Sequence, residues 1–146
     1  MKILAVAGAS GGHIYPALAF LERLPEEKSV SDALLVLPSR SIKADFDSCN
    51  YPIKYISSGR VSFSLNRRSV FAFLNLLKGG WESLSILLKF NPDIVIGFGS
   101  IDSISLVILA WFFRIKTIIH EQNVLPGKAN RFLAKFVDKI AVSFPD

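Results

Sequence analysis

The sequence predicts an α/β fold in which a Rossmann-like parallel sheet carries helices on both faces. Short apolar runs rich in β-branched residues alternate with helical segments along the whole chain. Such runs are typical of strands that are buried on both faces of a parallel sheet. Small, polar and ionisable residues follow four of these strands. Right-handed crossovers bring such segments to one edge of the sheet, where ligands bind in this fold class.

In the first half of the chain, three predicted strands alternate with two predicted helices. A strand is expected at 2–8, where the apolar run KILAVAG stops at a glycine turn, and a helix at 13–24. The helix is predicted from one apolar stripe at helical spacing. The stripe consists of Ile14, Ala17, Leu18, Leu21 and Leu24. The elements that follow are a strand at 33–37, a short helix at 41–48 and a strand at 53–56.

The second half begins with a loop at 57–66 and a long helix from about 67 to 90. Pro92 prevents that helix from running further, because proline lacks a backbone N–H and restricts the residue before it. The remaining expected elements are a strand at 93–99, a helix at 103–113, a strand at 116–120, a helix at 127–137 and a strand at 139–143.

The composition is that of a globular protein. Hydrophobic residues make up 51% of the 146 residues and charged residues 20%, which suits one domain, residues 1–146, with a core of its own. The mean hydropathy of +0.41 indicates a buried sheet, an apolar outer surface, or both. The net charge of +5 favours polyanionic partners such as anionic lipid or phosphorylated substrates. Nucleic acid is not expected, because the basic residues lie among apolar ones and not in a polar groove with stacking platforms.

Disulfides, a secretory signal and membrane-spanning segments are not expected. Cys49 is the only cysteine, so an internal disulfide is excluded. Residues 1–7 look like the start of a signal peptide, but the run stops at a glycine turn instead of a cleavage site. The longest apolar run, 104–113, is shorter than the ~20 residues of a spanning helix.

A glycine-rich turn made of Gly8, Ser10, Gly11 and Gly12 follows the first predicted strand. Glycines let a ligand approach the backbone closely, and a helix start offers unpaired N–H groups and a partial positive charge. The turn therefore suits a phosphate or a sugar hydroxyl. Its spacing matches neither a dinucleotide fingerprint nor a Walker loop. A tight turn that binds nothing is the alternative.

His13 is the candidate general base. It opens the first predicted helix, and the positive end of the helix dipole favours a neutral imidazole. The alternative is a structural histidine whose hydrogen bonds are satisfied within the protein.

A second polar segment follows the fifth strand and comprises His120, Glu121, Gln122 and Asn123. Such side chains recognise sugars and amides. Glu121 acts either as a base or as a holder of another residue, and a plain polar loop is the alternative for the whole segment. No cysteine or carboxylate has the spacing of a zinc site with the histidines, so no metal is expected.

The long helix carries apolar residues on more than one face and cations around them, which suits the headgroup region of an anionic membrane. A break at Gly79–Gly80 precedes its tryptophan, and 110–116 adds a second patch. Burial by other parts of the protein and an oligomer interface are the alternatives. The residues expected to contact the membrane are Arg67, Arg68, Phe71, Phe73, Leu74, Leu77, Lys78 and Trp81.

Three segments, GASGGHIYPALA (8–19), NPDIVIGFGS (91–100) and HEQNVLPGKANRFLAKFVDKIAVSFP (120–145), resemble the amino-terminal half of the MurG family. The resemblance implies the amino-terminal half of a GT-B glycosyltransferase without a cofactor. Such an enzyme moves N-acetylglucosamine with inversion from UDP-GlcNAc to the MurNAc C4 hydroxyl of lipid I. The product is lipid II for peptidoglycan, and the enzyme is peripheral on the cytoplasmic face of the membrane.

The resemblance also implies roles for particular residues. The donor would touch Ser10, Gly11, Gly12 and Asn123, and His13 would be a base or an acceptor contact. Gln122 and His120 complete the substrate-binding candidates, and Glu121 is the second candidate base. Most of the donor site would lie in a carboxyl-terminal domain or subunit, so this chain alone is expected to be incomplete and inactive.

The chain departs from the family pattern in two segments. Ala9 and Ser10 replace the glycine and threonine of the usual GGTGGH turn. Ser100, Ile101 and Asp102 stand where the family has a glycine-rich GGY segment. The second departure puts the recognition of the acceptor in question.

Two other functions compete with the transferase domain. One is a non-catalytic subunit that recruits a split GlcNAc transferase, acting on another polyprenyl-linked sugar, to the membrane. The other is a Rossmann oxidoreductase, which would need GxGxxG and an acidic residue after the second strand. That strand ends in VLPSR, which disfavours the oxidoreductase.

Overall fold

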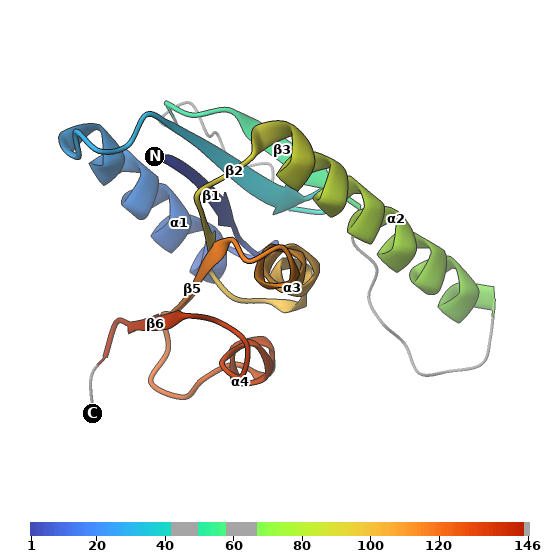
Figure 1. Cartoon of the computed structure of the whole chain (residues 1–146). Helices are drawn as coiled ribbons and strands as arrows, with labels where there is room; N and C mark the ends of the chain where they lie inside the picture. The colour runs from blue at the N-terminus through green and yellow to red at the C-terminus, as the bar shows by residue number, and fades with distance from the viewer. Residues whose placement is uncertain (42–49, 58–66, 145–146) are drawn as a thin grey trace.

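A computed structural model describes residues 1–41, 50–57 and 67–144, with backbone alone for 67–74 and 76 (Figure 1). The strands form one six-stranded parallel sheet in the order β3-β2-β1-β4-β5-β6. The strands are β1 Lys2–Val6, β2 Asp32–Pro38, β3 Ile53–Ile56, β4 Ile94–Gly97, β5 Lys116–Glu121 and β6 Lys139–Val142. The predicted Rossmann-like parallel sheet is therefore confirmed.

The helices cover both faces of the sheet, with α1 on one side and α2 and α3 on the other (Figure 1). Short 3₁₀ turns, η1 and η2, follow α1 and precede α3. No helix in the described part of the chain is long and apolar enough to span a bilayer. The bounds are α1 Gly11–Arg23, η1 Leu24–Glu26, α2 Arg67–Phe90, η2 Ile101–Ser103, α3 Ile104–Phe112 and α4 Lys128–Leu133.

The sheet separates two apolar cores. Ile3 and Ala5 of β1 pack on the α1 side, and Leu4 and Val6 pack on the side of α2 and α3. Successive side chains of a strand point to opposite faces, so a strand buried on both faces is apolar throughout. This is why the strands were recognisable as continuous apolar runs.

The last predicted helix is shorter than expected. Of the expected helix at 41–48, all residues but Ser41 lie outside the described part of the chain. A helix was expected at 127–137, but α4 ends at Leu133. The backbone N–H of Phe136 bonds three residues back, to the carbonyl oxygen of Leu133 at 2.9 Å, which tightens the chain into a turn. The turn brings the carboxylate of Asp138 to the backbone N–H of Thr117 at 2.7 Å, which aligns β6 with β5.

The expected break at Gly79–Gly80 is wrong, because α2 runs through both residues. Gly79 lies against the end of β3, where an added Cβ would overlap the carbonyl oxygen of Ser57. The backbone N–H and the hydroxyl of Ser57 both donate to the Glu82 carboxylate, one turn further along α2. Gly79 therefore allows the helix to dock on the sheet.

This docking predicts opposite effects for two neighbouring substitutions. Gly79→Ala is expected to lower the free energy of unfolding by about 1–3 kcal/mol, because the methyl group overpacks the contact with Ser57. A Cβ at Gly80 meets nothing within 4 Å. Gly80→Ala should therefore raise the free energy of unfolding by up to about 1 kcal/mol, because alanine is the better helix former. Urea unfolding of both variants measures the difference, and equal effects would contradict the docking.

Candidate functional site

The strand order reverses between β1 and β4, and at such a point the loops after the two strands leave a place for a ligand. These loops lie very close together. A Cβ at Gly8 would overlap the side chain of Ser100, and one at Gly99 would lie 3.0 Å from Nδ1 of His13. Gly99 also has a φ of +81°, which favours glycine. Gly8 and Gly99 therefore let the imidazole of His13 sit between the loops.

Gln122 joins the three predicted segments. Its side-chain nitrogen lies 2.9 Å from Nδ1 of His13, 2.8 Å from the carbonyl oxygen of Phe98 and 3.2 Å from that of Gly12. One amide thus connects the start of α1, the loop after β4 and the end of β5. The expected meeting of the glycine turn, His13 and the 120–123 segment at one edge of the sheet is present.

Glu121 is buried, with 4% of its surface exposed, and both carboxylate oxygens are hydrogen-bonded. Oε1 accepts from the backbone and side-chain N–H groups of Asn123 at 3.0 and 3.1 Å. Oε2 accepts from the backbone of Gly127 at 3.0 Å and the side chain of Asn130 at 2.9 Å. Burial works to raise the pKa of Glu121, but these N–H donors outweigh it and hold the pKa below its ordinary value. The arrangement favours the holding role over the base role.

His120 points away from Glu121, because neighbouring residues of a strand face opposite sides of the sheet. Its ring packs against Phe98, with ring centroids 5.5 Å apart, and its Nε2 lies 3.2 Å from the hydroxyl of Ser143. Burial lowers the pKa of His120, against a smaller opposing effect of Glu121. The polar segment is therefore split between the two faces of the sheet.

A hollow of about 260 Å³ lies at this edge, between the start of α1, the loop after β4 and the start of α4. Three predicted site residues line it, namely His13, Glu121 and Asn123. The predicted residues that do not line it are Ser10, Gly11, Gly12, His120 and Gln122. Asn130, which the sequence analysis did not select, also lines it and is 4% exposed. Its position inside α4 offered no signal in the sequence. The lining is His13, Ser100, Ile101, Glu121, Asn123, Gly127, Lys128, Ala129 and Asn130.

Ser10, Gly11 and Gly12 form the start of α1. Ser10 is the N-cap residue in an extended conformation, and its side chain makes no capping hydrogen bond. The first turn of α1 carries no acidic residue, so nothing in it opposes a bound anion. Ala9 does not have a positive φ, so the backbone there does not require glycine. Alanine can therefore replace the glycine of the family turn at this position.

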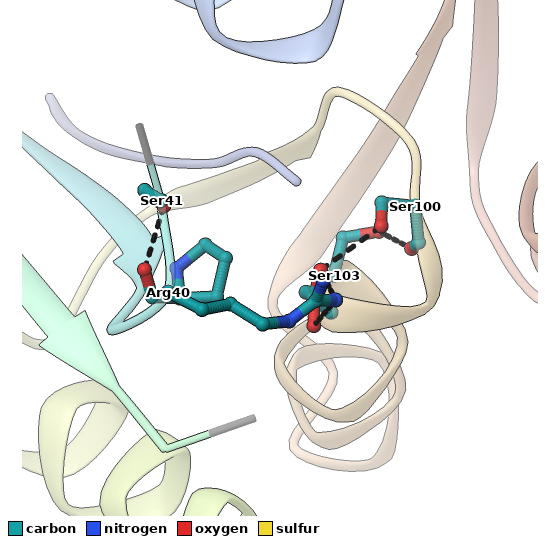
Figure 2. Close-up of polar contacts among 6 residues, drawn as sticks. Arg40, Ser41, Ser100 and Ser103 are labelled. Carbon is teal, nitrogen blue, oxygen red and sulfur yellow. Dashed lines mark hydrogen bonds and ion pairs between the residues drawn. The ribbon is translucent and has the colours of Figure 1, made fainter. Parts of the chain in front are cut away.

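The second segment that departs from the family pattern, residues 100–102, is held by an ion pair between the buried Asp102 and the partly exposed Arg40. Arg40, just after β2, donates to both carboxylate oxygens of Asp102 at 3.0 and 2.8 Å. The hydroxyl of Ser100 donates to the same carboxylate at 3.0 Å, and the hydroxyl of Ser103 donates to the carbonyl oxygen of Ser100 at 2.8 Å. Figure 2 shows Arg40 reaching across to this segment. Arg40 was visible in the sequence only as a basic residue after a strand.

Three of the expected membrane-contact residues are described with side chains. Leu77 is 55% exposed and Trp81 is 72% exposed on α2, and Lys78 is also exposed. The second expected patch is exposed at the end of α3, which packs beside α2, and includes Trp111 and Phe112. The side chains that lie outside the described residues are those of Arg67, Arg68, Phe71, Phe73 and Leu74.

Comparison with known proteins identifies relatives along the whole chain. The glycosyltransferase family 28 N-terminal domain matches residues 3–142. Two curated relatives are called UDP-N-acetylglucosamine--N-acetylmuramyl-(pentapeptide) pyrophosphoryl-undecaprenol N-acetylglucosamine transferase. The one from Alkaliphilus oremlandii is 35% identical and the one from Bacillus pumilus 37% identical. Each alignment covers 100% of this chain and 40% of the relative, so the chain spans about two fifths of their length.

Solved structures share the fold. Acinetobacter baumannii MurG has a TM-score of 0.81 at 23% identity, covering 99% of this chain and 42% of that one. UDP-GlcNAc 2-epimerase from Methanocaldococcus jannaschii has a TM-score of 0.62 at 19% identity, covering 96% of this chain and 38% of that one. At these identities the likeness concerns the fold.

Proposed function

We propose that this chain, which belongs to the glycosyltransferase family 28 N-terminal domain family, is the acceptor-side domain of an N-acetylglucosamine transferase of peptidoglycan synthesis. The whole enzyme moves N-acetylglucosamine from UDP-GlcNAc to the MurNAc C4 hydroxyl of lipid I and releases UDP and lipid II. The names of the curated relatives support this reaction. The observation that carries the proposal is that Gln122 joins the glycine turn to His13 beside a hollow. His13, Glu121 and Asn123 line that hollow.

The geometry suits an inverting displacement. The acceptor hydroxyl oxygen attacks the anomeric carbon and gives up its proton to water, while the bond from that carbon to the UDP oxygen breaks, so negative charge develops on the leaving diphosphate. The start of α1 supplies backbone N–H groups and the positive end of a 13-residue helix to such an anion. His13 and Asn123 line the adjoining hollow, where the sugar hydroxyls would lie.

The test of this function is reconstitution of the transfer. Mixing the 146-residue chain with the carboxyl-terminal half of a relative should give N-acetylglucosamine transfer from UDP-GlcNAc to a short-chain lipid I analogue. Each half alone should be inactive. Two folded halves that bind one another without any transfer would contradict the proposal and favour the recruiting subunit.

A substitution at Gly12 tests whether the glycine turn serves only packing or also binds the donor. A Cβ at Gly12 meets nothing within 4 Å, in contrast to Gly8. Gly12→Ala should therefore keep or raise the free energy of unfolding, because alanine favours the helix by up to about 1 kcal/mol. If the donor lies against this turn, the methyl group should raise KM for UDP-GlcNAc about tenfold. Thermal unfolding and KM in the reconstituted enzyme test this, and an unchanged KM would place the donor elsewhere.

We propose that the exposed apolar side chains of α2 and α3 bind the cytoplasmic face of an anionic membrane, which brings the hollow to its lipid-linked acceptor. Leu77 and Trp81 expose apolar surface beside Lys78, and α3, which packs on α2, exposes Trp111 and Phe112 at its end. Apolar side chains ringed by cations are suited to the headgroup layer.

Replacing Leu77 and Trp81 by serine should weaken binding to phosphatidylglycerol vesicles about tenfold, because two exposed apolar side chains lose their burial. Leu125→Ser is the matched control, since Leu125 is 82% exposed in the loop after β5. Flotation at two salt concentrations measures binding. Equal flotation of the double variant and the control would assign Leu77 and Trp81 to a protein contact.

A further inference from the structure

We propose that Gln122 holds neutral His13 in the tautomer with hydrogen on Nε2, so that His13 offers the site a hydrogen-bond donor and not a proton acceptor. The tautomer follows from contacts within the chain. The role that it implies for His13 in sugar transfer rests on the proposed function.

Two backbone carbonyls determine the orientation of the Gln122 amide. Its side-chain nitrogen lies 2.8 Å from the oxygen of Phe98 and 3.2 Å from that of Gly12, and both oxygens are acceptors only. Turning the amide over would set its oxygen against two carbonyl oxygens. Oε1 now lies buried without a partner among the described residues, so the turned amide would not gain an acceptor for its nitrogen there. The nitrogen is therefore the atom that faces His13.

The amide nitrogen in turn determines the tautomer of His13. It lies 2.9 Å from Nδ1, and an amide nitrogen donates hydrogen bonds and does not accept them. The amide nitrogen carries two hydrogens, and its two shortest contacts take them, the Phe98 oxygen at 2.8 Å and Nδ1 at 2.9 Å, while the Gly12 oxygen at 3.2 Å shares one of the two. Nδ1 therefore accepts and carries no hydrogen, and the single hydrogen of the neutral ring is on Nε2. The one lone pair of the neutral ring is already used by Gln122.

The surroundings of the ring keep this arrangement. A Cβ at Gly99 would lie 3.0 Å from Nδ1 and 3.1 Å from Cε1, and one at Gly8 would lie 3.0 Å from Cδ2, so the ring is packed on both loops. A carboxylate at Nδ1 would favour the opposite tautomer, as in a serine-protease triad. The neighbouring carboxylate, Glu121, instead accepts from Asn123, Gly127 and Asn130.

The consequence is a defined role for His13 in the hollow. With Nδ1 turned to Gln122, Nε2–H is the group that meets a ligand, and it donates to an oxygen, such as that of a sugar hydroxyl or a phosphate. His13 then orients the oxygen that it contacts, and Gln122 is the positioning residue behind it.

Nuclear magnetic resonance of the 146-residue chain labelled with ¹⁵N-histidine tests the tautomer without any transfer reaction. The chain has two histidines, and the signals lost in His13→Asn identify His13. Above neutral pH, the long-range ¹H–¹⁵N spectrum should show a protonated Nε2 and an unprotonated Nδ1 for His13. In Gln122→Leu, the same signals should move toward the averaged pattern of a free imidazole, while those of His120 keep their positions.

A protonated Nδ1 in the unaltered chain would overturn the proposal, and so would a His13 pattern that Gln122→Leu leaves unchanged. The spectrum of the unaltered chain decides the question even if the variant does not fold. A chain with the expected tautomer that fails to restore transfer would instead contradict the proposed function alone.

Discussion

His13→Ala is expected to lower kcat of the reconstituted transferase by about 100-fold or more, because a hydrogen-bond donor aimed at an oxygen that gains negative charge in the transition state typically contributes that much. His13→Gln should recover most of the loss. The glutamine amide can donate a hydrogen bond to a substrate oxygen, but it cannot accept a proton as a base.

His120→Gln is the matched control for these variants. His120 is the second histidine of the chain, and its ring packs against Phe98 and does not line the hollow. It should keep kcat within about threefold, as expected for a substitution outside the reacting site. Steady-state rates with varied UDP-GlcNAc separate kcat from KM. If His13→Gln is as inactive as His13→Ala, the donor role is wrong and the base role returns.

Glu121→Gln is expected to lower the free energy of unfolding by about 2–4 kcal/mol at pH 7, because it breaks a buried, charged hydrogen-bond network. Every oxygen position of the carboxylate faces N–H donors from Asn123, Gly127 or Asn130. In the glutamine variant, the side-chain NH₂ replaces one carboxylate oxygen, so its N–H groups face two N–H donors that then lack an acceptor. Urea unfolding measures the loss.

The same network predicts how stability depends on pH. The pKa of Glu121 in the folded chain lies below its ordinary value of 4.5. The stabilisation from Glu121 is therefore complete above that value and is lost as the pH falls through the lower, folded pKa. The difference in free energy of unfolding between the unaltered chain and Glu121→Gln should be largest near neutral pH and shrink in acid.

Glu26→Gln provides the comparison for a surface carboxylate. Glu26 makes an exposed ion pair with Arg23 at 3.5 Å, and such pairs contribute little to stability. Its substitution should leave the free energy of unfolding within about 0.5 kcal/mol. A Glu121→Gln variant as stable as Glu26→Gln would show that the hydrogen bonds of Glu121 do not hold the Asn123 and Gly127 segments in place.

The sequence by itself determined the fold class, the approximate place of the described strands and the edge at which the site lies. Strands buried on both faces are continuous apolar runs, and parallel strands end at a common edge, so both features can be predicted from local pattern. The resemblance to a transferase family followed from residues at the same edge. The local pattern predicted that the last helix extends to residue 137, but α4 ends at Leu133. The chain turns after Leu133 because Asp138 makes a tertiary contact with Thr117.

Only the tertiary structure decided what each side chain at that edge does. His120 and Glu121 are neighbours in the sequence, but the alternation of a strand sends them to opposite faces of the sheet. His13 and Gln122 lie 109 positions apart in the sequence, and their contact depends on three loops that converge only after folding. The direction of a hydrogen bond depends on which atoms meet, and therefore the roles of these residues follow from the packed structure and not from their identity or spacing.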